Sequence, residues 1–543
     1  MTPTSAAETY GGQFLLDPSA PAFSPEKFTA DERLMADTAL QFAKGEVLPI
    51  VERLDAQEDG LMPALVQKAC ELGFGGPDTP EQYGGLGLSK SVATRILEML
   101  SLNGSFSTTI GVQQGVAQLP IALFGSEEQK QKYLPKLTSG EWMGAYALSE
   151  PNSGSDALSA SSRAVMNGSN YEITGTKMWI SNAKWAKLFA TFAKIDGEKF
   201  SCFLIERDYP GVEISREEHK MGLKGSSTAR LVLDNAAVPC ENLLYEAGMG
   251  HRVALNALNI GRCKIGAMAL GQVRSAMHVA AKYAKERKQF GQPIANFGLM
   301  REKLARMAAL MFGAESALYR TSGLLDDAFD RRDPNGDAID ENRKACEEFQ
   351  IECSLTKVLT TEVLSAIVDE ALQIHGGYGF TEEFAIARLY RDARVMRIYE
   401  GTNEINRVFA FDRIVKRGVI QKLIDAAPTC PAHSYLIQAA RAIDTSSPMP
   451  QELTACMSDL LILTYAQQSA NRRAEAMRQN NDANASFGSL AASSFEGITT
   501  AWAASRCSEA LARAGASSSV SLSPSTCDST LADALLEKDG YPI

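Results

Sequence analysis

Two changes of periodicity divide this chain. From Thr29 to about Leu137, apolar residues recur every three to five positions, as they do on one face of a helix. Around Met143 this pattern gives way to short runs of β-forming residues separated by Gly, Asn and Asp. From His251 onward helical periodicity returns over long stretches. The sequence therefore predicts a β domain held between helical domains.

The length of 543 residues exceeds what one ordinary core accommodates, so we expect several domains. The first 25 residues contain no Lys or Arg and several Gly, Pro and Ser, which indicates a mobile arm. Gly515 to Ser525 is rich in serine and predicts a flexible insertion. The predicted division is a flexible arm at 1–28, a helical domain at 29–142, a small antiparallel β-barrel or sandwich at 143–252, a helical bundle at 253–417 and a C-terminal helical domain at 418–543.

Composition excludes several classes of protein. With 45% hydrophobic and 22% charged residues the chain is typical of globular proteins, and its net charge of −11 argues against nucleic-acid binding as its main task. The ten cysteines form no C-x-x-C pair, so neither a disulfide framework nor a metal site is expected. We find no secretory signal, no Arg-rich transit peptide and no stretch long enough to span a bilayer, and we expect a cytoplasmic protein.

One carboxylate stands in an unusual sequence context. Glu400 follows the apolar pair Ile398 and Tyr399 and precedes Gly401. Apolar neighbours that exclude water raise the pKa of a carboxyl group toward the range of a general base, and the glycine lets a substrate come close. The alternative is a solvated glutamate at a helix end before a glycine cap.

Four further segments combine hydroxyl groups, glycines and aromatic rings. Together they suit a flat heterocycle with an anionic or polar part. Singly, each has an ordinary explanation: Trp179 as a core residue, Phe290 as a helix-end contact, and Gly376-Gly377 as a helix stop. The segments are Tyr146 to Asp156, Lys177 to Asn182, Arg287 to Gly291 and Gln373 to Phe380.

In this order, and with a β domain between helical ones, the five segments resemble the acyl-CoA dehydrogenase family from about residue 30 to 415. The length, the run from Leu299 to Met307 and the extra C-terminal domain resemble the very-long-chain branch. The resemblance implies a mainly α fold with a helical N-terminal domain, a central β-barrel and a four-helix bundle, plus a C-terminal helical domain. It also implies FAD at the point where the domains meet.

The same resemblance implies the roles of individual residues. Two of these segments would reach FAD from a neighbouring subunit, which implies a homodimer or a tetramer; their residues are Arg287, Phe290, Gln373, Ile374, Gly376 and Gly377. Ser181 replaces the commoner threonine and keeps its hydroxyl. The implied FAD contacts are Tyr146, Leu148, Ser149, Gly154, Ser155, Trp179, Ile180, Ser181, Arg287, Phe290, Gln373, Ile374, Gly376, Gly377, Thr402 and Glu404. The implied substrate contacts are Ser155, Asn259, Arg262 and Gly401.

The implied reaction is the α,β-dehydrogenation of a fatty acyl-CoA to trans-2-enoyl-CoA in fatty-acid β-oxidation, by an oxidoreductase acting on a CH–CH bond. Glu400 would remove the pro-R α proton while the β hydrogen leaves as hydride to FAD. The Glu400 amide and a ribityl hydroxyl would polarise the thioester carbonyl. Some branches carry the base just before Arg262, where this chain has Gly261, so Glu400 is the only matching base. Electron-transferring flavoprotein is the implied acceptor.

The sequence says less about the length of the acyl chain and about which of several related functions the protein has. Gly104, Gly111 and Gly115 would leave room for a long acyl chain, or they serve helix packing. An acyl-CoA oxidase passing electrons to O2 is one alternative, and a catalytically inactive DNA-binding relative with a basic C-terminal surface is another. In the very-long-chain branch the C-terminal domain supports a dimer and contacts membrane. Because this segment carries more acids than bases, we favour dimer support over membrane association.

Overall fold

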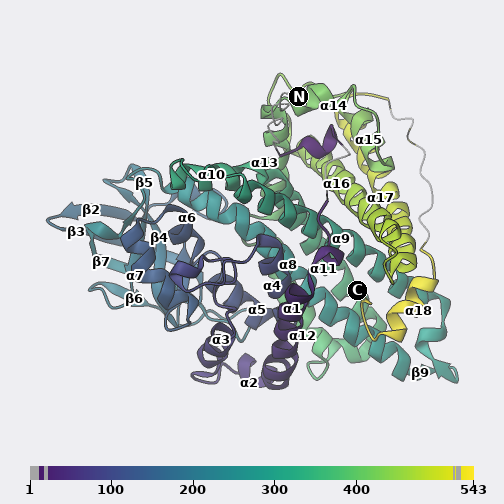
Figure 1. The fold of residues 1–543 in the computed structure, drawn as a ribbon, viewed down its shortest axis with the longest axis horizontal. Coiled ribbons are helices and arrows are strands. Elements are labelled where there is room, and N and C mark those ends of the chain that lie inside the picture. The colour runs from purple at the N-terminus through teal and green to yellow at the C-terminus, as the bar shows by residue number, and fades with distance from the viewer. Residues whose placement is uncertain (1–10, 18–21, 518–519, 521–526, 543) are drawn as a thin grey trace.

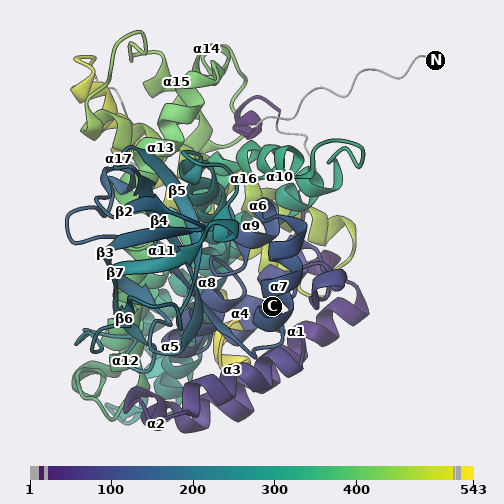
Figure 2. The ribbon, with the colours of Figure 1, turned by 90° about the vertical axis from the view of Figure 1, so that its left-hand side faces the viewer.

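The computed structural model describes residues 11–17, 22–517, 520 and 527–542. A strand-rich lobe lies at one end of the molecule, long helices fill its middle, and the C-terminal helices stand at the other end (Figure 1). Turning the molecule shows the sheet in front of the long helices, with the first helices along one flank (Figure 2). The predicted order of helical, β and helical regions is therefore confirmed.

The N-terminal helices begin at strong capping residues. Thr29 and Glu32 form a reciprocal capping box at α1, and Ser126 and Gln129 form another at α7. Each box satisfies backbone N–H groups that the first helical turn leaves without partners. The helices of this region are α1 (Ala30–Phe42), α2 (Val51–Asp55), α3 (Leu61–Glu71), α4 (Lys90–Leu100), α5 (Gly104–Gln113), α6 (Leu119–Phe124) and α7 (Glu127–Thr138).

The predicted β domain is present as one mostly antiparallel sheet, but this sheet is open and does not close into a barrel. Its order is β6-β7-β3-β2-β4-β5-β8, with β1 also beside β4, and both β1 and β2 run parallel to β4. The end strands β6 and β8 are three and two residues long and offer too little backbone to close the ring. The strands are β1 (Met143–Ala147), β2 (Arg163–Asn167), β3 (Asn170–Ser181), β4 (Ala186–Ile195), β5 (Lys199–Glu206), β6 (Val212–Ile214), β7 (Thr228–Pro239) and β8 (Leu243–Leu244).

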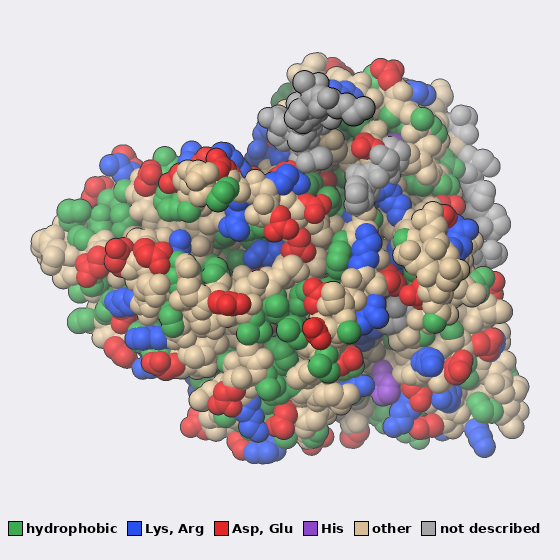
Figure 3. Space-filling model, viewed as in Figure 1, with side chains coloured by type: hydrophobic (Ala, Val, Ile, Leu, Met, Phe, Trp, Pro, Cys, Tyr) green, Lys and Arg blue, Asp and Glu red, His purple; other side chains and the backbone are tan. Residues whose placement is uncertain are grey.

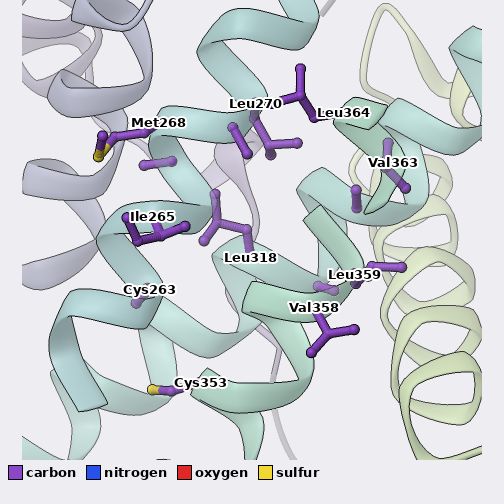
Figure 4. Close-up of a cluster of buried hydrophobic side chains, with 14 of the residues drawn as sticks. Cys263, Ile265, Met268, Leu270, Leu318, Cys353, Val358, Leu359, Val363 and Leu364 are labelled. Carbon is purple, nitrogen blue, oxygen red and sulfur yellow. The ribbon is translucent and has the colours of Figure 1, made fainter. Parts of the chain in front are cut away.

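Three long helices, α8, α9 and α11, form the centre of the molecule. Side chains such as Ile265, Leu318 and Val358 are buried between them (Figure 4). A short hairpin of β9 (Lys288–Gln289) and β10 (Gln292–Pro293) joins α8 to α9. The helices of this region are α8 (Gly250–Glu286), α9 (Gly298–Asp330), α10 (Ala338–Glu348), α11 (Gln350–His375), α12 (Ala385–Ala393) and α13 (Asn403–Lys416).

The C-terminal helices pack directly on this centre. Gly313 of α9 lies so close to the Phe495 ring of α17 that an added Cβ would approach it to 2.4 Å, so the ring packs directly on the backbone of α9 at this point. The helices after residue 418 are α14 (Val419–Leu423), α15 (Pro431–Ala440), α16 (Gln451–Gln479), α17 (Ala485–Arg513) and α18 (Thr530–Glu537).

A buried charge cluster connects these helices to the rest of the chain. Arg473 of α16 pairs with Glu315 of α9 at 2.7 Å and with Glu26 at 2.6 Å. Arg274 of α8 joins Glu315 to Glu98 of α4, 2.5 Å from the latter. Arg95 completes the cluster at 3.3 Å from both Glu98 and Glu315. Three guanidinium groups therefore balance three carboxylates inside the protein, which is the condition under which buried charges are tolerated.

The described part of the predicted N-terminal arm is not free. Phe14 and Leu15 are buried, and Phe14 packs edge-on against Tyr465 of α16. The Gly12 amide donates to the buried carboxylate of Glu352 at 2.6 Å. The prediction of a flexible arm is therefore wrong for 11–17, because the apolar side chains of Phe14 and Leu15 are buried against helices far along the chain. Residues 1–10 and 18–21 lie outside the described residues.

Two other expectations concern the serine-rich segment and membrane-spanning helices. Most of the predicted serine-rich insertion, at 518–519 and 521–526, also lies outside the described residues. Over the part of the chain that the structure describes, no helix combines the length and apolar character needed to cross a bilayer.

Candidate active site

A chamber opens where α5, β1, β3 and α8 meet the segment before α13. A second chamber lies beside it, on the side of α12 and of the chain between β6 and β7. Both chambers are lined by Ser149, Trp179 and Glu400. The structure thus brings the predicted base together with two of the four glycine- and aromatic-rich segments.

Glu400 sits in a strained turn that faces α8. Its backbone has φ +52°, and Gly401 follows with φ +84°, so two consecutive residues are left-handed. The carboxylate lies against Gly261: a Cβ added there would stand 2.3 Å from Glu400 Oε2. This oxygen is buried and has no hydrogen-bond partner among the described residues. The absence of a side chain at 261 is therefore what makes room for the carboxylate.

Burial raises the pKa of Glu400 to about 7, and the positive charges of Arg262, Lys357 and Lys264 oppose the rise. Ile398, which we expected to exclude water from this carboxylate, is 50% exposed and lines the second chamber instead. The close packing of Gly261 beneath the carboxylate takes that role. The carboxylate can accept a proton near neutral pH.

The loop after β1 is fixed by a buried ion pair. Lys177 Nζ lies 2.6 Å from Glu150 Oε1, and both side chains are almost fully buried. The Glu150 carboxylate also accepts hydrogen bonds from the Ser161 amide at 2.6 Å and the Ser162 amide at 3.1 Å. These contacts tie the loop to β3, so Ser149 and the exposed Gly154 and Ser155 are held beside both chambers.

An irregularity in β3 turns Trp179 outward. The pairing of β3 with β7 shifts register between Lys177 and Ile180, and Trp179 has φ +62°. As a result its indole is 59% exposed and lines both chambers. Ser181 also lines both. Ile180 borders the first chamber, but its side chain is 2% exposed and packs in the sheet core.

Polar atoms without partners surround the first chamber. Arg262 donates from Nη1 to Asn259 Oδ1 at 3.0 Å and to Ser354 Oγ at 3.2 Å, while its buried Nε finds no acceptor within the part of the chain that the structure describes. The Tyr146 hydroxyl is likewise buried, and no described residue hydrogen-bonds to it. Asn259 supports Arg262 and is not among the chamber's lining residues. Buried polar atoms normally have partners, so these orphans indicate a polar ligand.

The start of α13 forms part of the second chamber. Thr402 is the N-cap of this helix, and its Oγ1 accepts from the Ile405 amide at 3.3 Å. Thr402 also lines the second chamber, whereas the exposed Glu404 in the first helical turn does not. Hydrogen bonding to its own helix terminus lowers the pKa of Glu404.

Most of the remaining predicted residues line a separate surface groove. Arg287, Ile374, Gly376 and Gly377 line it, and none of them lines either chamber. Phe290, at the tip of the β9–β10 hairpin, is 93% exposed with φ +50°, and Gln373 is exposed at the end of α11. Within one chain these six residues are therefore not assembled with Glu400.

The sequence did not predict which residues form the floor of the first chamber, and the structure changes the role expected for three glycines. A Cβ at Gly111 would approach Met268 Sδ to 2.7 Å, and one at Gly115 would approach Lys264 Cδ to 3.4 Å. Met268 and Lys264 therefore occupy part of the space that the glycines leave, and all four residues line the chamber. Gly104 lines neither chamber and packs against Asp392, as the helix-packing alternative proposed.

Two buried lysines near Glu400 were also not predicted from the sequence. Lys264 Nζ is 3.1 Å from Asp78, which also pairs with Lys90 at 2.8 Å. Lys357 is fully buried behind the Glu400 turn. A signal for Lys357 was available, because it is the only charged residue in the stretch from Leu355 to Thr361, whose other members are apolar or carry hydroxyl groups.

Comparisons with known proteins cover most of the chain. Models of the N-terminal, middle and C-terminal domains of acyl-CoA dehydrogenases match residues 29–141, 145–236 and 248–415. A probable acyl-CoA dehydrogenase of Bacillus subtilis is 46% identical over 416 residues, which are 75% of this chain and 70% of that protein. The human mitochondrial very-long-chain specific acyl-CoA dehydrogenase is 38% identical over 379 residues, 68% of this chain but only 54% of the human protein.

A solved structure extends the likeness to the C-terminal helices. The crystal structure of an acyl-CoA dehydrogenase complexed with FAD from Bacillus anthracis has a TM-score of 0.91 and 38% sequence identity. The likeness covers 98% of this chain and all of that one.

Proposed function

Because the chain belongs to the acyl-CoA dehydrogenase family, we propose that it is an FAD-dependent dehydrogenase that converts a long-chain acyl-CoA to its trans-2-enoyl-CoA. The observation that carries the proposal is the Glu400 carboxylate. It lies against Gly261, it has a buried oxygen that no described residue hydrogen-bonds, and its pKa is raised to about 7.

The residues around the two chambers suit FAD. Trp179, Met221 and Ile398 are large apolar side chains that are at least half exposed, and all three line the second chamber. A flat ring system would cover this otherwise costly surface. Thr402, at the N-terminus of α13, adds backbone N–H groups that suit a polar or anionic part. Bound FAD supplies the acceptor for the hydride that leaves the β carbon.

Glu400 acts as the base. A pKa near the working pH makes proton transfer from the α carbon efficient. Before the transfer, Arg262, Lys357 and Lys264 favour the carboxylate form. An acyl chain that fills the first chamber excludes water from the carboxylate, which strengthens these interactions.

We propose a long-chain substrate on two grounds. The first chamber runs from Glu400 to the floor at Gly111, Gly115, Lys264 and Met268, and methionine is an unbranched, adaptable side chain. The human relative in the comparison is also very-long-chain specific. The place in fatty-acid β-oxidation follows from this substrate class.

The partners and setting are proposals as well. The groove at Arg287 and Gly376 is apart from the chambers, which suits FAD contacts contributed by a second copy in a homodimer or tetramer. Electron-transferring flavoprotein is the proposed acceptor by family resemblance, and the cytoplasm the proposed location. A membrane contact of the C-terminal helices has no support from a spanning helix in the described residues.

The two alternative functions require different surfaces or give different products. A DNA-binding relative would carry a basic surface, yet acidic and basic side chains are interspersed on the face seen in Figure 3, and the net charge is −11. An acyl-CoA oxidase would use the same base, so it is separated by product: hydrogen peroxide formed at the rate of turnover would favour the oxidase.

The test is an anaerobic titration of the purified protein with acyl-CoAs of graded length, followed by loss of the visible flavin absorbance. We expect bleaching with long chains, and Glu400→Gln should keep FAD and bind acyl-CoA but turn over about 10²- to 10⁴-fold more slowly. Protein without flavin, or flavin that no acyl-CoA bleaches, would refute the assignment. Substantial activity in Glu400→Gln would place the base elsewhere.

A further inference from the structure

A buried ammonium stands behind the turn that carries Glu400. Lys357 lies in the middle of α11 with 0% exposure. It donates to the carbonyl oxygen of Gly401 at 2.9 Å and to Asn403 Oδ1 at 2.8 Å. Both acceptors are neutral, and burying a cation on neutral acceptors is costly compared with an apolar side chain. Packing alone therefore gives no reason for a lysine at this position.

The carbonyl that Lys357 holds belongs to the left-handed turn. Gly401 O also accepts from Asn406 Nδ2 at 2.8 Å, so donors from α11 and α13 grip it together. A left-handed backbone is uncommon for a residue with a side chain, such as Glu400, and persists only when its surroundings fix it. These two donors are part of what fixes it.

Lys357 and Glu400 also influence each other's charge. Burial lowers the pKa of Lys357 to about 7; Glu400 is the strongest influence in the other direction, Glu362 and Glu404 act with it, and Arg262 opposes it. The positive charges of Arg262, Lys357 and Lys264 in turn act to lower the pKa of Glu400. Each of the two buried groups therefore favours the charged form of the other.

We propose that Lys357 is a positioning residue for the reaction, whose ammonium fixes the Glu400–Gly401 turn and keeps the carboxylate ionised until it takes the substrate's α proton. The role in the reaction rests on the proposed function. The coupling between Lys357 and Glu400 exists without substrate and can be measured separately.

The test compares two ways of removing a donor from Gly401 O. Lys357→Met removes the donor and the charge, whereas Asn406→Leu removes a neutral donor to the same oxygen. Lys357→Met should fold, because Gly401 O keeps Asn406 and Asn403 Oδ1 keeps a contact with Thr361 Oγ1 at 3.4 Å. Lys357→Gln, which keeps a donor without the charge, is the second variant.

The first readout is the pH profile of kcat/KM. We expect the acid limb of Lys357→Met to move upward by about 1 pH unit, as for loss of a nearby opposite charge. The variant should therefore lose about 10-fold more activity at pH 6 than at pH 9. Asn406→Leu should lower the rate without moving the midpoint.

The second readout needs no turnover. For each protein, the thermal stability is compared with that of its Glu400→Gln partner across pH. Because the folded pKa of Glu400 is raised from 4.5 to about 7, its favourable contribution is complete below pH 4.5 and is lost as the pH rises to about 7. Without Lys357 this loss should extend about 1 pH unit higher.

The outcomes separate the two proposals. If the pH midpoints of both readouts are unchanged in Lys357→Met and Lys357→Gln, the proposed role of Lys357 is overturned. An equal shift of the midpoints in Asn406→Leu also overturns it, because the geometry of the turn, and not the charge, would then be responsible. A shift in the stability readout, in a parent protein that turns over no acyl-CoA, overturns the proposed function and supports the coupling.

Discussion

Gly261→Ala should remove activity while leaving the protein folded. The new Cβ would lie 2.3 Å from Glu400 Oε2, and ordinary contact begins at 3.4 Å, so the carboxylate must move by about 1 Å. A misplacement of this size costs about 10²-fold in rate, or about 2.7 kcal/mol of transition-state stabilisation. Because the clashing atom is the end of a flexible side chain, the fold can yield at that point. Alanine also favours the helical state over glycine by up to about 1 kcal/mol.

The assay pairs kcat/KM with chemical denaturation. Gly45→Ala, where an added Cβ meets nothing within 4 Å, serves as the control and should leave kcat/KM unchanged. In a Glu400→Gln background, Gly261→Ala should cost little further activity, because the group it displaces has already lost its function. Full activity of Gly261→Ala would refute the contact between α8 and the base. A loss of activity matched by an equal loss of stability would show that the helix, and not the carboxylate, had moved.

Three further changes probe other parts of the molecule. Glu400→Gln should raise the free energy of unfolding at pH 8 by up to about 3 kcal/mol and have little effect at pH 4, because the folded pKa of about 7 lies above the unfolded value of 4.5; denaturation at both pH values checks this. Met268→Ala should tighten binding of acyl-CoAs longer by two methylenes roughly 10-fold, at about 0.8 kcal/mol per buried methylene; calorimetric titration without turnover measures it, and an unchanged length preference contradicts the assigned floor. Arg473→Met should lower the free energy of unfolding by about 3–5 kcal/mol by leaving Glu315 undercompensated, whereas the exposed Arg478→Met should cost at most about 1 kcal/mol; equal effects would count against the buried charge cluster.

The order of the domains was readable because periodicity is local. The helical repeat before Leu137 and the β-forming runs after Met143 each arise within a few residues, and the structure confirms their order. The closure of the sheet was not readable. It depends on whether β6 and β8 have enough backbone to pair, and the short runs in the sequence do not reveal partners. Phe14 and Leu15 were missed for the same reason, since their groove is built by helices far along the chain.

The candidate active site, too, could be predicted from the sequence only in part. Glu400 was marked by its immediate neighbours and by Gly261, and the structure places these two residues in contact. The shielding assigned to Ile398 failed because the turn directs that side chain into the second chamber. Lys264 and Lys357 resemble surface charges in sequence, since their burial is decided by how α8 and α11 pack.

The buried charge cluster has a consequence for anyone who wishes to shorten the chain. Cutting after residue 418 would give a protein of the length that the three family models span, yet it would strip Arg473 from Glu315 and Glu26 and uncover the face of α9 at Gly313. We expect such a truncation to aggregate unless that helix face is redesigned together with the two acids. The C-terminal helices are therefore not a detachable appendage, and proteolysis should find no nick between α13 and α16 that releases an intact catalytic fragment.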